Sequence, residues 1–214
     1  CLFTNGETIV LFWVDDCIFY SNTNSAIDKL IDNLKEEFLL EKEEDMAGFL
    51  GLQIDRSTPG TVVLTQTGLI ERILVLMELE ECNLKYTPAD KIPLGKDEDG
   101  EPCKEGWEYR SVVGMMLYLA GSTRPDIAYA VHQCARFSHN PKRCHEVALK
   151  HIARYLQGTK DKGMILTPKV KDLRLDLFAD ADFAGLFVAE DKHDPISVKS
   201  STGLLLNFGG VPIF

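Results

Sequence analysis

A pair of adjacent carboxylates interrupts an apolar run near the start of this chain. Residues 8–20 read TIVLFWVDDCIFY, with Asp15 and Asp16 in the middle. Branched and aromatic residues on both sides favour two strands joined by a tight turn. Charged side chains avoid the buried centre of a strand. We therefore expect both carboxylates at the exposed tip of a β-hairpin.

The rest of the chain alternates between helical and strand patterns, which predicts an α+β fold. Helical spacing of apolar residues predicts helices at 25–38, 69–79, 108–121, 123–138 and 141–156. Alternating or β-branched runs predict strands at 49–54, 61–65, 173–179, 203–208 and 211–214. The three consecutive helices after residue 108 are joined by short loops and should form an antiparallel layer.

Several residues suit the ends of these elements. Ser25 and Asp28 resemble a capping box at the first helix. Thr123 is a plausible N-cap ahead of Pro125, and Gly158 is placed for a C′ cap. Residues 86–105 hold three prolines and many charges, which indicates an extended linker.

Composition is that of an ordinary globular protein, with 45% apolar and 26% charged residues among 214. No apolar run reaches the roughly 18 residues that a membrane span needs, so we expect no membrane partner. The six cysteines form no CxxC pair, which favours reduced thiols in an intracellular protein. The chain lacks an initiator Met and opens in what reads as mid-domain sequence, so we expect a fragment.

Charge is unevenly distributed along the chain. The formal net charge is −10, yet residues 136–174 carry ten basic and three acidic side chains, a local charge of 10 − 3 = +7. A local basic surface can contact phosphates even on an acidic protein. A solvated helix face accounts for the same pattern equally well.

The Asp15-Asp16 pair suits metal-assisted phosphoryl transfer. Joining a nucleotide to a primer hydroxyl uses two divalent cations about 4 Å apart, held by carboxylates. Adjacent carboxylates in a tight turn repel each other unless cations offset their charge. The competing interpretation is an ordinary surface turn, where Asp is common. The flanking apolar strands favour the metal site.

Residues 12–16, Phe-Trp-Val-Asp-Asp, resemble the Phe/Tyr-x-Asp-Asp box of reverse transcriptases, and in particular that of Ty1/copia retrotransposons. FLGLQI at 49–54 is similar to the strand where that family builds its primer grip, and TQTGLIERIL at 65–74 resembles the segment leading out of the palm. Trp13 stands where the family usually has Tyr, close to the primer end.

The resemblance continues in order along the chain. YRSVVGMMLYLAGSTRPDIAYAV at 109–131 and HEVALKHIARYLQGT at 145–159 are similar to two copia motifs. FADADFAG at 178–185 and VKSSTGLLLNFGGVP at 198–212 resemble the opening strands of the copia RNase H. The Asp-Asp box alone is a weak signal, whereas the ordered series covers essentially the whole chain.

This resemblance implies a domain division and an activity. It implies the C-terminal half of a palm at 1–66, a helical thumb and connection at 67–170, and incomplete RNase H-like strands at 171–214. The implied parent enzyme is an RNA-directed DNA polymerase with RNase H, which uses Mg²⁺ or Mn²⁺. Its implied partners are an RNA/DNA template-primer duplex and dNTP, and its location is a cytoplasmic virus-like particle.

Site residues follow from the same resemblance. It implies Asp15, Asp16 and Asp180 as catalytic metal ligands, with Asp182 a weaker candidate. It implies nucleic-acid contacts for the residues of the primer region and the basic helix: Trp13, Leu50, Gly51, Lys142, Arg143, Lys150 and Arg154. The remaining carboxylates of both active sites lie outside these motifs, so we expect the isolated chain to be inactive.

Two other functions remain open. The chain is alternatively a non-catalytic, nucleic-acid-binding remnant of a decayed element. It is alternatively an unrelated Mg²⁺-dependent phosphoryl-transfer enzyme, in which Asp15-Asp16 and Asp180-x-Asp182 meet in space.

Histidine, cysteine and arginine positions suggest structural roles. Cys134, His139, Cys144 and His145 lie within 12 residues, but two fall inside predicted helices at spacings that do not converge on a zinc ion. We expect Arg124 to pair with Asp126 and fix the loop rather than bind a phosphate. We expect His132 and His151 to be helix-surface or helix-packing residues.

Overall fold

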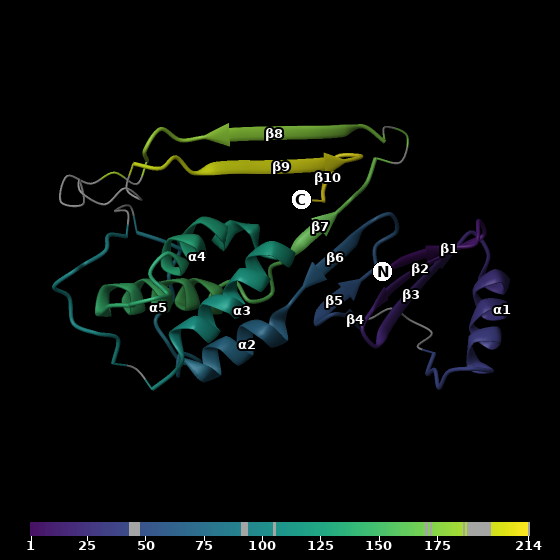
Figure 1. The fold of residues 1–214 in the computed structure, drawn as a ribbon, viewed down its shortest axis with the longest axis horizontal. Coiled ribbons are helices and arrows are strands. Elements are labelled where there is room, and N and C mark those ends of the chain that lie inside the picture. Colours follow the sequence, from purple (N-terminus) through teal and green to yellow (C-terminus); the bar gives the residue numbers. More distant parts are fainter. Residues whose placement is uncertain are drawn as a thin grey trace. The chain divides into compact units, whose positions relative to one another are not determined.

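A computed structural model describes residues 1–42, 48–90, 94–104, 106–169, 171, 173–185, 187 and 198–213. The chain divides into two compact units, residues 1–50 and 51–214, and each is described by itself (Figure 1). The described residues form five α-helices and small antiparallel sheets. The α+β class is therefore confirmed at this level. No helix in the described ranges has the length and apolar character to cross a membrane.

The first unit is a three-stranded antiparallel sheet with one helix. Strands β1 (Leu2–Thr4), β2 (Thr8–Trp13) and β3 (Asp16–Ser21) lie in that order, and helix α1 (Asn24–Lys35) contacts β3. The predicted hairpin and the packing of the helix on its sheet are confirmed. Ile31 is the buried anchor of α1.

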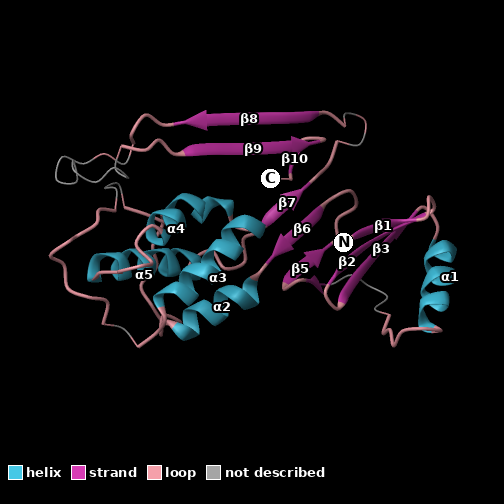
Figure 2. Ribbon diagram, in the orientation of Figure 1, coloured by secondary structure: helices cyan, strands magenta, loops and turns pink. Residues whose placement is uncertain are grey.

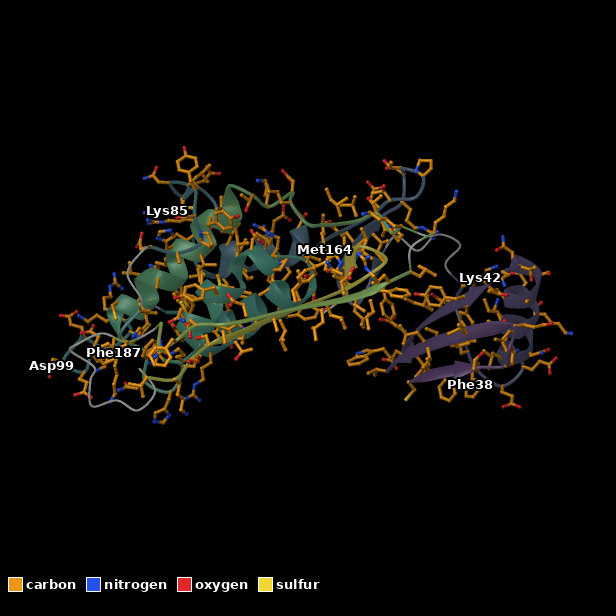
Figure 3. The ribbon with its side chains drawn as sticks, turned by 90° about the horizontal axis from the view of Figure 1, so that it is seen from above. Phe38, Lys42, Lys85, Asp99, Met164 and Phe187 are labelled. Carbon is orange, nitrogen blue, oxygen red and sulfur yellow. The ribbon has the colours of Figure 1, made fainter. Side chains whose placement is uncertain are left out.

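The capping box predicted at the start of α1 is wrong, although the helix begins within one residue of the predicted position. Thr23 is the N-cap, and its side chain makes no capping hydrogen bond. Ser25 and Asp28 therefore lie inside the helix, and no capping box forms there. Lys42, which follows the helix and is labelled in Figure 3, pairs with Asp28 at 2.6 Å.

The single strand predicted at 49–54 is interrupted. Strand β4 (Gly48–Phe49) and strand β5 (Leu52–Asp55) are separated by a turn at Leu50 and Gly51. Their φ angles are 52° and 73°. Both values lie in the left-handed region, which a regular strand does not visit. The apolar alternation concealed this turn.

In the second unit, β5 pairs antiparallel with β6 (Val62–Thr65), and β6 pairs antiparallel with β7 (Met164–Leu166). The turn predicted at Pro59-Gly60 is present, with Gly60 at φ 75°. Strand β7 was not predicted, because three residues are too short for a periodic signal. It begins at Met164, labelled in Figure 3, and joins a sheet whose other strands lie about a hundred residues earlier.

Helices α2 (Thr67–Leu76), α3 (Tyr109–Ser122), α4 (Ala128–Ala135) and α5 (Arg143–Gln157) pack together in the second unit, with a short 3-10 helix η1 (Pro125–Ile127) before α4 (Figure 2). All were predicted within a few residues, except that α4 ends earlier than expected. Their fully buried residues include Ile70, Ile73, Val112, Met116, Leu119, Ile127, Val131, Leu149, Ala153 and Leu156.

Two predicted caps are wrong. Thr123 is the C-cap of α3 rather than the N-cap of the next helix, and its hydroxyl donates to Gln66 Oε1 at 2.9 Å. Gly158 is the C-cap of α5 with φ −74°. It therefore does not use the left-handed conformation that favours glycine at a C′ position.

The segment predicted as an extended linker, 86–105, contains neither helix nor strand at 86–90 and 94–104. An isolated bridge joins Pro102 to Lys142. Residues 91–93 and 105 lie outside the described residues.

The C-terminal strands β8 (Leu175–Ala181), β9 (Thr202–Phe208) and β10 (Val211–Pro212) form an antiparallel sheet in the order β10-β9-β8. This agrees with the predicted strands, although Phe214 lies outside the described residues. Apolar side chains of this sheet are exposed, including Leu177 at 65% and Phe178 at 57%. The three-part domain division remains a prediction.

Candidate metal hairpin and basic helical face

The Asp15-Asp16 hairpin is the candidate site of the first unit. Trp13 and Asp16 are the last paired residues of β2 and β3, so Val14 and Asp15 form a two-residue turn. Asp15 is in the turn and Asp16 begins β3, and both are exposed. The expected exposed position at the hairpin end is therefore observed. At the beginning of β3, partial burial and the negative charge of Asp16 raise the pKa of the Cys17 thiol.

One of the chain's strained backbone positions lies beside the carboxylates. Val14 has φ 54° and is 71% exposed. A positive φ is costly for a β-branched residue, and such strain concentrates at functional sites. A two-residue hairpin loop needs positive φ, which glycine or asparagine usually supplies. Val14, whose side chain is largely exposed to solvent, therefore holds a strained backbone conformation next to Asp15.

The hairpin presents two adjacent carboxylates to solvent, which are ligands that Mg²⁺ and Mn²⁺ accept. In the described part of the chain, no three His, Cys, Asp or Glu side chains gather as a metal site. Asp15 and Asp16 thus offer a pair of ligands rather than a closed cage. Trp13 and Phe12 flank them and are 59% and 40% exposed.

Asp180 lies in β8 opposite Gly203 and is exposed. Its Oδ1 accepts a hydrogen bond from the Ala181 N–H at 3.0 Å. Asp182 follows the strand, and its Oδ1 accepts from the Ser201 N–H at 2.6 Å. Asp15 and Asp180 belong to different units, so the hypothesis that these two acidic clusters meet stays open.

The basic helical face is a separate candidate site in the second unit, and Glu146 contacts several of its residues. This carboxylate is fully buried at the start of α5. Arg143 donates to Glu146 Oε1, and Lys150 Nζ lies 3.7 Å from the same oxygen. Two predicted nucleic-acid residues are therefore ion-paired within the chain.

Glu146 also holds the segment 94–104 against α5. Its Oε2 accepts hydrogen bonds from Cys103 Sγ and from the Lys104 N–H, both at 3.3 Å. Sequence reasoning missed this role. Glu146 lies three residues after Arg143 and four before Lys150, and this helical spacing of opposite charges could have predicted the ion pairs.

Lys142 and Arg154 differ from the other two basic residues. Lys142 Nζ donates to the carbonyl oxygens of Glu98 and Gly100 at 3.2 and 3.1 Å. These acceptors are neutral, so Lys142 differs from Arg143 and Lys150 in having no ion pair with Glu146 among the described residues. Arg154 is partly buried, and its Nε has no hydrogen-bond partner among the described residues.

Arg124 has the structural role that the sequence predicted. It is 2% exposed, and it donates from Nε and Nη2 to the two carboxylate oxygens of Asp126 at 3.0 and 2.8 Å. It also donates to the carbonyl and hydroxyl of Thr159 at 2.9 and 2.7 Å. Burial opposes ionisation of Asp126, but hydrogen bonds from Arg124 and Tyr155 outweigh it and lower the pKa of this carboxyl.

His145 is fully buried and stacks on Phe137, with ring centroids 4.1 Å apart. Its Nδ1 accepts from the Lys142 N–H at 2.8 Å, so Nε2 carries the proton and donates to the Gly95 carbonyl at 2.8 Å. Burial lowers the pKa of this imidazole. His151 is also buried and contacts the Thr87 carbonyl, whereas His132 is exposed on α4, as predicted.

Comparisons with known proteins assign the family. The chain is 35% identical over 97% of its length to a Retrovirus-related Pol polyprotein from transposon RE1 of Arabidopsis thaliana. It is 34% identical over 96% of its length to the corresponding polyprotein from transposon TNT 1-94 of Nicotiana tabacum. It is also 32% identical over 82% of its length to an uncharacterized mitochondrial protein of Arabidopsis thaliana, of which it covers 72%.

These relatives define a class of retrovirus-related Pol polyproteins from transposons. Within that class, this chain belongs to the Ty1/copia-type retrotransposon Pol family. It spans about 14% of the length of the RE1 polyprotein and 15% of that from TNT 1-94. No family model matches the chain, and no solved structure matches it.

Proposed function

We propose that this chain is the part of an RNA-directed DNA polymerase that runs from its catalytic Asp-Asp hairpin into an RNase H domain. In this proposal, Asp15 and Asp16 bind the Mg²⁺ or Mn²⁺ ions of nucleotide transfer. Asp180 is the first carboxylate of the RNase H site. The location is the cytoplasmic virus-like particle of the parent element.

One observation supports this proposal most strongly: two adjacent, exposed carboxylates at the end of a β-hairpin in a chain of the Ty1/copia Pol family. Their exposure leaves room for cations, and their adjacency suits two-metal chemistry. The strained turn at Val14 supports the same conclusion, because strain of this kind is retained where geometry serves a function.

The helices α3–α5 serve as the thumb and connection in this proposal, and they contact the template-primer duplex through its backbone. The ion pairs of α5 refine which residues do so. Arg143 and Lys150 share the single negative charge of Glu146, so each contributes less to phosphate binding than Lys142. Trp13, Leu50 and Gly51 remain proposed contacts near the primer end.

The proposal assigns Asp15 and Asp16 to one reaction and Asp180 to the other. We therefore expect the isolated chain neither to extend a primer nor to cleave an RNA–DNA hybrid, with or without dNTP and Mg²⁺. Incorporation of nucleotides by the purified chain would contradict this expectation.

The proposal is tested by measuring how Mn²⁺ changes the affinity for a template-primer with a recessed 3′ end. Fluorescence anisotropy of a labelled RNA–DNA hybrid gives the affinity with and without the metal. We expect Mn²⁺ to strengthen binding to the wild-type chain, because ions at Asp15 and Asp16 attract the primer end. Asp15→Asn and Asp16→Asn should remove the metal-dependent gain and keep metal-free binding.

Asp32→Asn is the matched control, because Asp32 is an exposed carboxylate on α1 of the same unit. It should retain the full gain. An identical gain in Asp15→Asn and wild type would overturn the metal role. Salt-sensitive binding with no response to metal in the wild type would instead favour the non-catalytic, nucleic-acid-binding remnant.

A further inference from the structure

A basic pocket lies where the segment 94–104 meets the connection between α4 and α5. Its volume is about 360 Å³, within the range of small-molecule sites. Arg136, Phe137, His139, Asn140 and Lys142 line it, together with the ion pair formed by Lys96 and Glu98. None of the motifs that carry the family resemblance includes Arg136, Phe137, His139 or Asn140.

The pocket retains positive charge that its described lining does not neutralise. Lys96 Nζ lies 2.6 Å from Glu98 Oε1, so those two charges offset each other. Arg136 donates from Nη1 to the amide oxygen of Gln133 at 2.9 Å, and Lys142 donates to two backbone carbonyls. All of these acceptors are neutral. The Asp97 carboxylate is near, because it acts on Cys144 and His145, but no ion pair joins it to Arg136 or Lys142 among the described residues. Arg136 and Lys142 therefore remain able to bind a further anion.

Contacts with neighbouring side chains position Arg136 to bind such an anion. Its guanidinium carbon lies 5.1 Å from the centre of the Phe137 ring, and that ring stacks in turn on the buried His145. The Arg136 Nε is buried and has no hydrogen-bond partner within the described ranges. An unpaired buried donor is costly unless a ligand or water satisfies it. The Phe137 ring and the hydrogen bond to Gln133 restrict the guanidinium, which suits bonding to a phosphate.

A third cation, which does not line the pocket, lies near this positive region. Arg110 on α3 is exposed, and its Nε donates to the Ser138 carbonyl at 2.8 Å. Ser138 directly precedes His139 in the chain. This contact ties α3 to the α4–α5 connection through another neutral acceptor.

We propose that this pocket binds a phosphate group of the nucleic-acid backbone, with Arg136 and Lys142 as the main cations and Asn140 and His139 as further hydrogen-bonding groups. The inference rests on the proposed duplex-binding role and assigns it a specific anchoring point. This proposed site differs from non-specific attraction of the duplex to a basic helix surface, because the phosphate contact depends on Arg136 and Lys142.

The test measures how salt weakens binding of an RNA–DNA hybrid to the wild type, Arg136→Gln and Lys142→Gln. Each lost phosphate contact should reduce the slope of log affinity against log salt by roughly 0.9. Lys162→Gln is the matched control, because Lys162 is an exposed cation of the same basic stretch outside the pocket. It should leave the slope unchanged.

A second measurement needs no variant. The Nε–H signal of Arg136 in a ¹⁵N NMR spectrum should shift when the wild-type chain is titrated with the hybrid, because the donor gains a partner. Pyrophosphate provides a separate arm, since it carries the same chemistry without a nucleic acid.

The outcomes separate this inference from the proposed function. Reduced slopes in both pocket variants, with a shifted Arg136 signal, support the inference. Hybrid binding with the wild-type slope in both variants overturns it and leaves duplex binding standing. A shift with pyrophosphate but no hybrid binding supports a phosphate pocket and overturns the duplex-binding role. No response to either anion overturns the inference.

Discussion

Replacing Arg124 with Ala should destabilise the second unit severely. This side chain is 2% exposed and joins three positions of the fold. It forms a two-point ion pair with Asp126, donates twice to Thr159, and lies 5.5 Å from the centre of the Tyr155 ring. Tyr155 closes the cluster by donating to Asp126 at 2.7 Å.

The geometry of this cluster sets the size of the effect. A hydrogen bond to a charged group typically contributes about 1.5–3 kcal/mol, and loss of one partner of a buried pair costs about 3–5 kcal/mol. The Asp126 side chain is 39% exposed, so water screens and rehydrates it after the substitution. We therefore expect a loss near the lower limit, about 3 kcal/mol.

Urea unfolding monitored by tryptophan fluorescence measures this loss. The chain has two tryptophans, and a Trp13→Phe background leaves Trp107 as the reporter of the second unit. With a slope of about 2 kcal/mol per M, the midpoint should fall by about 1.5 M. Arg110→Ala is the control, because that exposed side chain makes a hydrogen bond to a backbone carbonyl. Because water can replace the partner of an exposed donor, this substitution should cost less than about 1 kcal/mol.

A midpoint change below about 0.3 M in Arg124→Ala would refute this reasoning, because it would place the loss near about 0.6 kcal/mol. An equal change in Arg124→Ala and Arg110→Ala would refute it as well. In either case the cluster around Arg124 would be dispensable for the fold.

Three further predictions concern single groups. Val14→Gly should raise the free energy of unfolding of the first unit by about 1 kcal/mol, measured by circular dichroism, because glycine adopts positive φ without strain. Because the pKa of His145 is lowered in the folded chain, the neutral imidazole stabilises the fold fully above about pH 6.5. This stabilisation is lost as the pH falls through the folded pKa, by up to about 1.4 kcal/mol per pH unit. Urea midpoints measured against pH should show the loss, and His132→Gln should not alter it. Burial raises the pKa of Cys134 to about 12, so at pH 8 a thiol reagent should label the exposed Cys1 first and Cys134 only after unfolding, as followed by mass spectrometry.

Sequence periodicity predicted most of the helical core because burial of one apolar face is a local property of each helix. The helix containing Leu149, Ile152 and Leu156 was found in this way. The hairpin was predicted because two adjacent acids inside a β-branched run fit a turn between strands far better than the interior of a strand. In both cases the signal lies within one segment.

Features that depend on distant partners were missed. Strand β7 forms only because β6 offers an edge about a hundred residues away. Thr123 donates its hydroxyl hydrogen bond to Gln66 rather than capping the following helix, because Gln66 is buried beside it. Glu146 neutralises neighbouring cations that charge counting assigned to phosphate binding. The Arg136 pocket likewise depends on the segment 94–104 returning to α5.

The position of a bound Mn²⁺ ion tests the central claim most directly. Mn²⁺ broadens the NMR signals of nearby backbone amides, so a titration of the ¹⁵N-labelled chain locates the ion. The proposed polymerase role predicts selective broadening around residues 13–17 in the wild type and in Asp32→Asn, and its loss in the Asp15→Asn, Asp16→Asn double variant. Broadening elsewhere, or unchanged broadening in the double variant, would contradict a metal-binding role for the hairpin.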